Sequence, residues 1–133
     1  YQTFGFLIHF KRMRNLVIII LVLFSVSCMT NYPLTTFYVK NTTDKTLNFK
    51  ASIIKQSQMG PYEMTLPFMV FPNDSVVARR TNFKKDASPT AWFKKFIIFQ
   101  TDSLSFNDPK NKDNWIKTTD EKGRPVYTFT MTK

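Results

Sequence analysis

The chain is poor in the side chains that most familiar catalytic and metal sites require. Its 133 residues include one cysteine, one histidine and three glycines. A single cysteine excludes an intramolecular disulfide framework and a zinc site built on several cysteines. Acidic residues are also scarce, 9 against 19 basic ones, which gives a formal charge of +10. That balance is typical of chains that meet nucleic acid, an acidic surface or a membrane.

One long apolar run stands out near the start of the chain. Residues 16–26 read LVIIILVLFSV, a cationic stretch at residues 11–14 precedes them, and Ser27 and Cys28 come directly after them. This order of charge, apolar run and small residues is that of a secretory signal. The run is shorter than the roughly 20 residues of a membrane-spanning helix. We therefore predict that residues 1–27 are a signal peptide, which would be absent from the mature protein.

The beginning of the chain raises a separate question about the start of the protein. Residues 1–12 precede Met13, and Met13 followed by Arg14 and the apolar run would already make a complete short signal. Residues 1–12 are therefore interpreted as an over-long gene start or as a longer cationic region. The only histidine, His9, lies within them.

The cysteine at the end of the apolar run suggests a lipid anchor. Ser25-Val26-Ser27-Cys28 resembles a lipobox, the site at which a bacterial signal peptidase cuts before a diacylated cysteine, although Ser25 replaces the usual Leu. Stable anchoring to a membrane needs more than one lipid signal. Several acyl chains on one cysteine would meet this requirement. The alternative is an ordinary secreted protein with an incidental cysteine. We predict lipid attachment, including palmitate, at Cys28.

The predicted mature chain lacks the side chains of the most common catalytic sites. Residues 28–133 contain no histidine and no thiol other than Cys28, and their formal charge is +7. Ser-His-Asp and Cys-His catalysis are therefore excluded. Acidic residues gather in the later loops, but their spacing matches no calcium-binding loop, so they are interpreted as ordinary loop residues, with a calcium site left open. These residues are Asp102, Asp108, Asp113, Asp120 and Glu121. We predict a non-enzyme without cofactor or metal.

The remaining chain reads as strands separated by turns. Leu47, Phe49, Ala51 and Ile53 alternate with polar residues, and residues 126–132 alternate in the same way, which is typical of half-buried strands. The predicted strands cover residues 36–40, 46–55, 62–71, 75–80, 92–100 and 126–132, and residues 114–118 are predicted as a brief strand or a turn. No stretch has a helical period. The pattern predicts a single all-β domain, a sandwich or a barrel, over residues 36–133, joined to Cys28 by a tether at residues 28–35.

Two features of these strands carry more specific predictions. Pro67 interrupts residues 62–71, and proline cannot donate to a strand ladder, so this strand is expected at a sheet edge or bulge. Residues 92–100, WFKKFIIFQ, are strongly apolar and are expected to form a central strand.

The chain resembles short lipoproteins of Bacteroides-type bacteria. The resemblance depends on four segments: Ser27-Cys28, Tyr38-Val39-Lys40-Asn41, Phe71-Pro72-Asn73-Asp74-Ser75-Val76 and Phe96-Ile97-Ile98-Phe99. It implies an immunoglobulin-like β-sandwich on an outer-membrane anchor and brings no general activity with it. Some members carry an acidic export signal just after the cysteine, whereas residues 29–32 here are uncharged. That difference favours the periplasmic face of the outer membrane over the cell surface.

A basic patch is the first candidate binding feature. Arg79, Arg80, Lys84 and Lys85 lie close in sequence, and aromatic residues are interleaved nearby, as in grooves that bind single-stranded nucleic acid. A solvated positive loop is the simpler interpretation, and an exported protein rarely meets nucleic acid. We expect no nucleic-acid partner, and an acidic glycan or anionic lipid headgroup suits the charge better.

The two tryptophans are the second candidate. Trp92 leads the apolar segment 92–100 and is expected in the core. Trp115 lies among polar residues, so it is the more exposed candidate, able to stack on a sugar with help from Lys112 and Lys117. The leading hypothesis is thus a lipid-anchored envelope protein with a binding or structural role toward an envelope protein. A glycan-binding accessory lipoprotein is the alternative.

Overall fold

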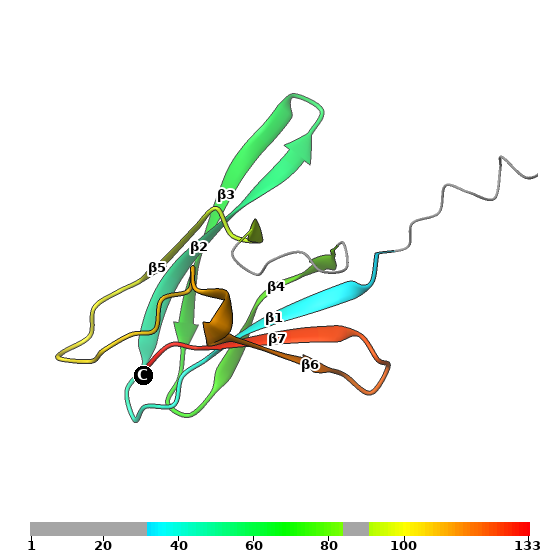
Figure 1. Cartoon of the computed structure of the whole chain (residues 1–133). Helices are drawn as coiled ribbons and strands as arrows, with labels where there is room; N and C mark the ends of the chain where they lie inside the picture. Colours follow the sequence, from blue (N-terminus) through cyan, green and yellow to red (C-terminus); the bar gives the residue numbers. More distant parts are fainter. Residues whose placement is uncertain (1–31, 84–90) are drawn as a thin grey trace, which may run out of the picture. The chain divides into compact units, whose positions relative to one another are not determined.

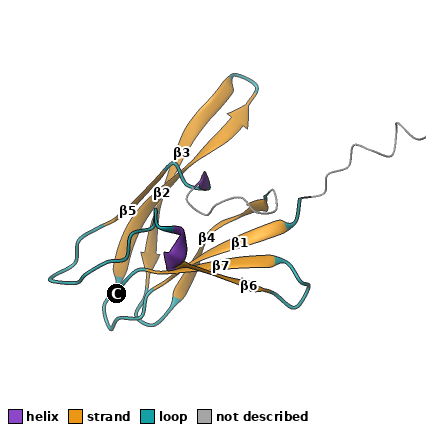
Figure 2. Cartoon of the chain, in the orientation of Figure 1, coloured by secondary structure: helices purple, strands orange, loops and turns teal. Residues whose placement is uncertain are grey.

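The alternating segments form strands in a computed structural model of the chain, which describes residues 32–83 and 91–133. The described strands are β1 (Leu34–Lys40), β2 (Leu47–Ser57), β3 (Gly60–Val70), β4 (Ser75–Asn82), β5 (Lys95–Ile98), β6 (Trp115–Thr119) and β7 (Pro125–Thr130). A short 3-10 helix, η2 (Lys112–Asn114), precedes β6. Figure 2 shows the strands and their connecting loops. The predicted signal peptide, Cys28, Lys84 and Lys85 lie outside the described residues.

The strands make two sheets, as Figure 1 shows. The four-stranded sheet has the order β4-β1-β7-β6, and the three-stranded sheet has the order β3-β2-β5. β1 runs parallel to β7, and the other pairs are antiparallel. The predicted small all-β sandwich is confirmed. Its strand order differs from that of the constant immunoglobulin domain. Here the second and third strands, β2 and β3, pair in one sheet, whereas the second and third strands of that domain, B and C, lie in different sheets.

The core lies between the sheets and is largely aromatic. Phe37 of β1 is fully buried, and its ring centroid lies 4.0 Å from that of Trp92 and 5.6 Å from that of Tyr127. The predicted alternation is confirmed, because one face of each of these segments is buried: Leu47, Phe49 and Ala51 of β2, and Tyr127, Phe129 and Met131 at the end of the chain. Burying each large apolar side chain contributes roughly 1.5–3 kcal/mol. Trp92 belongs to this core, as predicted.

The prediction of a central strand at residues 92–100 is wrong. β5 spans only Lys95–Ile98 and lies at an edge of the three-stranded sheet. The segment is apolar because Trp92 and Phe93 enter the core before the strand begins, 3% and 9% exposed respectively. The strand with Pro67, β3, is an edge strand as predicted.

A bulge in the pairing of β1 with β4 changes which side chains of β4 face inward. Val39 pairs with Val76 and Tyr38 with Val77, but Phe37 pairs with Arg79, so Ala78 has no partner of its own. A bulge shifts the alternation of a strand by one residue. Arg79 therefore shares the inner face with Phe37.

Candidate functional site

Trp115 does not form the exposed sugar-stacking surface that its polar neighbours suggested. Only 6% of the residue is exposed, and its ring stacks on Phe93 with centroids 5.9 Å apart. Its indole Nε1 donates a hydrogen bond to the Pro109 carbonyl oxygen at 2.9 Å. Successive strand residues point to opposite faces, so Trp115 can enter the core while Ile116 is exposed. The prediction of an exposed Trp115 is wrong.

The two lysines assigned to the same site are exposed but do not surround a platform. Lys112 lies in η2, and Lys117 lies on the edge strand β6. The Lys117 ammonium lies 5.8 Å from the centroid of the Tyr127 ring, a cation–π contact on the side of the domain. With Trp115 turned inward, these lysines remain two separate surface charges.

The two arginines of the basic patch differ in their surroundings, because successive residues of β4 point to opposite faces. Arg79 is half-buried, its Nη1 donates to the Trp92 carbonyl oxygen, and its guanidinium lies 4.6 Å from the centroid of the Phe83 ring. Its Nε is buried with no hydrogen-bond partner in the described part of the chain. Burial lowers the pKa of Arg79 from its ordinary value. Arg80 is exposed. The expectation of one uniformly solvated patch does not hold for this pair.

The two arginines lie beside a cleft between the sheets. The β2–β3 hairpin projects away from the four-stranded sheet (Figure 1), and the two sheets leave a cavity of about 400 Å³ between the hairpin and β4. The lining combines apolar hairpin side chains with basic ones. The residues that line this interstrand cleft are Ile53, Ile54, Lys55, Met64, Leu66, Ala78, Arg79, Arg80 and Thr81.

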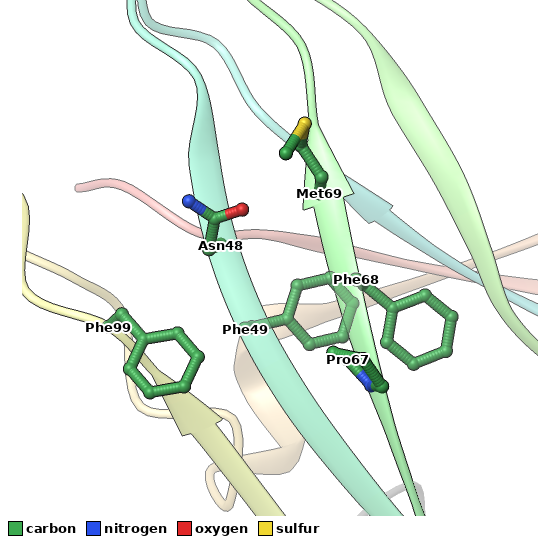
Figure 3. Close-up of a pocket in the computed structure, with 6 residues that line it drawn as sticks. All are labelled: Asn48, Phe49, Pro67, Phe68, Met69 and Phe99. Carbon is green, nitrogen blue, oxygen red and sulfur yellow. The ribbon is translucent and has the colours of Figure 1, made fainter.

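A second hollow lies on the three-stranded sheet. Its volume is about 590 Å³, and Figure 3 shows the residues around it. They are Asn48, Phe49, Pro67, Phe68, Met69 and Phe99. Met69 and Phe99 are 56% and 41% exposed, and Lys50 lies 5.4 Å from the centroid of the Phe99 ring. This apolar face is open, and the described residues that line it supply apolar side chains and one amide.

Sequence reasoning missed both features, although a signal for the second exists. Phe68 and Ile98 pack against the core. Because successive strand residues point to opposite faces, the adjacent residues Met69 and Ile97 point away from the core and are exposed. Apolar residues at both alternating positions of an edge strand mark an exposed apolar face. The interstrand cleft has no such signal, because it depends on how far the two sheets diverge.

Two of the loop carboxylates form separate local ion pairs. Asp102 pairs with Lys45, and Asp120 pairs with Arg124 at 2.7 Å. The Arg124 backbone N–H donates to Asp120 and lowers the pKa of that carboxyl below its ordinary value. Within residues 32–83 and 91–133, no three His, Cys, Asp or Glu side chains gather as a metal site would need, and no helix is long and apolar enough to cross a membrane.

Comparison with known proteins adds no assignment. No family model, curated protein or solved structure matches the chain. The function must therefore be argued from the sequence and the geometry of this domain.

Proposed function

We propose that the chain is a lipid-anchored, non-catalytic protein of the bacterial envelope that acts by binding, with the periplasmic face of the outer membrane as its location. The observation that carries the proposal is the signal pattern ending at Cys28, with the first strand beginning soon after it at Leu34. Lipid on Cys28 would hold the sandwich beside the membrane surface. The resemblance to short Bacteroides-type lipoproteins supports the same arrangement.

The described surface suits binding. The interstrand cleft has both apolar and charged walls, the combination typical of a small-molecule site, which buries apolar surface and orients its ligand through a few polar groups. The glycan alternative loses its main support, since Trp115 is buried. The proposed role is therefore binding at the cleft, with the domain as a rigid support.

Metabolic labelling with palmitate tests the anchor. The full chain is expressed in a bacterium, and labelled palmitate is expected on the wild-type protein and absent from the Cys28→Ala variant. Met29→Ala, a change at the next residue, serves as the matched control and should keep the label. Label on the Cys28→Ala variant, or none on the wild type, would overturn the lipid anchor.

A further inference from the structure

We propose that the interstrand cleft binds a single-chain anionic amphiphile, a long-chain carboxylate, with its tail against the β2–β3 hairpin and its head at the arginines of β4. This inference names a ligand class for the binding role proposed above, and it rests on that role. The proposal comes from three features of the cleft: an apolar wall, a basic wall and a matching size.

The apolar wall consists of inward-facing hairpin residues that the other sheet covers only in part. Ile53 pairs with Met64 across the hairpin, and Leu66, which pairs with Ala51, is 43% exposed. These positions continue the core face of β2 and β3 beyond the end of the packed core. An alkyl chain placed along them would remove apolar surface from water, which contributes roughly 25 cal/mol per Å² buried.

The charged groups of the cleft carry one sign only. Lys55 of the hairpin and Arg79 and Arg80 of β4 line it, and no carboxylate of the described residues does. The nearest acidic residue on the hairpin, Glu63, pairs with Lys95 at 3.1 Å instead. A guanidinium offers two parallel N–H donors that match the two oxygens of a carboxylate. The charge complementarity therefore selects an anion.

Arg79 is held in place before any ligand arrives. Its hydrogen bond to the Trp92 carbonyl oxygen and its position over Phe83 fix the guanidinium at the wall of the cleft. Its Nε has no partner among the described residues, and a buried donor without an acceptor is unfavourable. An anion in the cleft supplies negative charge next to this group, while the exposed Arg80 can close over the head.

The size of the cleft favours one alkyl chain over a polymer. Its volume of about 400 Å³ lies within the range of roughly 300–1,000 Å³ for small-molecule sites. The hollow of the apolar face is larger, but no cation of the described residues lines it, and nothing on the three-stranded sheet indicates what would cover it. The cleft is the better site because its two walls together define one ligand chemistry.

The test is an NMR titration of residues 29–133, which contain the complete core cluster from Phe37 to Met131. Sodium decanoate, kept below its micelle concentration, is compared with decanol, which lacks the charge, and sodium acetate, which lacks the tail. Amide shifts are expected with decanoate at residues 53–55, 64–66 and 78–81, with weaker binding of decanol and acetate. Equal affinity for decanol, or shifts confined to Met69 and Phe99, would overturn the proposal.

Two pairs of variants test how the basic wall and the apolar wall of the cleft contribute to binding. Arg80→Ala is expected to weaken decanoate binding about tenfold, the loss of one charge-assisted hydrogen bond, with little effect on decanol. Lys117→Ala removes an exposed charge elsewhere and should change nothing. Leu66→Gln should weaken both decanoate and decanol, whereas Ile116→Gln, at an exposed position on β6, should weaken neither.

The proposed ligand class and the proposed lipid anchor can be disproved independently of each other. If decanoate does not bind and palmitate still labels Cys28, the ligand class is wrong and the envelope role stands. If decanoate binds at the cleft and no label appears on Cys28, the site stands and the anchor is wrong.

Discussion

Asn41 joins three parts of the chain through one buried side chain. The residue is fully buried, and the two hydrogens of its Nδ2 are shared among the carbonyl oxygens of Lys45, Val70 and Phe71, which lie at 2.6, 3.1 and 3.1 Å. Its Oδ1 accepts a hydrogen bond from the Thr43 backbone N–H at 2.9 Å. The turn after β1 is therefore fixed to the end of β3, so that β1 and β3, which belong to different sheets, are held at a defined separation.

Asn41→Asp should be strongly destabilising although it keeps the shape of the side chain. It replaces the donor with an oxygen that faces carbonyl oxygens, and it buries a charge. We expect the free energy of unfolding, measured in urea, to fall by about 3 kcal/mol or more at neutral pH. Burial raises the pKa of the new carboxyl above its unfolded value, so the loss should shrink as the pH falls and the folded state takes up the proton.

Asn82→Asp is the matched control for this change. The Asn82 side chain is exposed and donates a single hydrogen bond, to the Tyr32 carbonyl oxygen at 2.7 Å. Water can replace that bond, so the change should stay within about 0.5 kcal/mol. Equal losses in the two variants would show that Asn41 has no special role.

Each sheet contains a hairpin turn with a glycine of positive φ, and the two glycines differ in how far their φ lies from the left-handed helical region. Gly60 begins β3 with φ of 109°, and Gly123 lies between β6 and β7 with φ of 72°. Asn tolerates the left-handed region near φ of about +57°, but a φ well beyond it is sparsely populated for any residue with a Cβ. No atom within 4 Å would meet a Cβ at either glycine, so backbone strain alone separates them.

Gly60→Asn is therefore expected to cost about 1–3 kcal/mol and Gly123→Asn less than about 1 kcal/mol. Hydrogen exchange of the backbone amides in β2 and β3 measures the first effect, and exchange in β6 and β7 measures the second. Loss of protection that is as large for Gly123→Asn as for Gly60→Asn would contradict the difference in strain.

The elements show what the sequence can and cannot predict. Alternation of side chains correctly grouped Leu47 with Phe49, and Tyr127 with Phe129, because residues two apart on a strand share a face and these faces meet the core. It could not place Arg79, since the bulge that turns it inward depends on the pairing of β4 with β1. The prediction for Trp115 was wrong for a related reason. Its polar neighbours indicated only that the outer face of β6 is solvated, whereas Trp115 lies on the inner face. The interstrand cleft depends on sheet divergence, which has no local signal.

The first and last strands of the described domain, β1 and β7, pair with each other inside the four-stranded sheet. β1 lies inside the four-stranded sheet, antiparallel to β4 and parallel to β7, with Phe37 opposite Tyr127. Every member of the buried core cluster lies between Phe37 and Met131. The core therefore needs β1 and β7 together, and such distant pairings also predict slow folding, on the order of milliseconds to seconds.

Two truncated chains test the role of this pairing. Residues 29–133 should unfold in urea in one cooperative transition and show the near-ultraviolet circular dichroism of packed aromatic rings. A chain that begins at Asn41 lacks β1, leaves β4 and β7 without their common neighbour and removes Phe37 from the core, so it should show neither property. A cooperative transition in the shorter chain would mean that β1 is dispensable, and its absence in the longer one would mean that the core needs residues before 29.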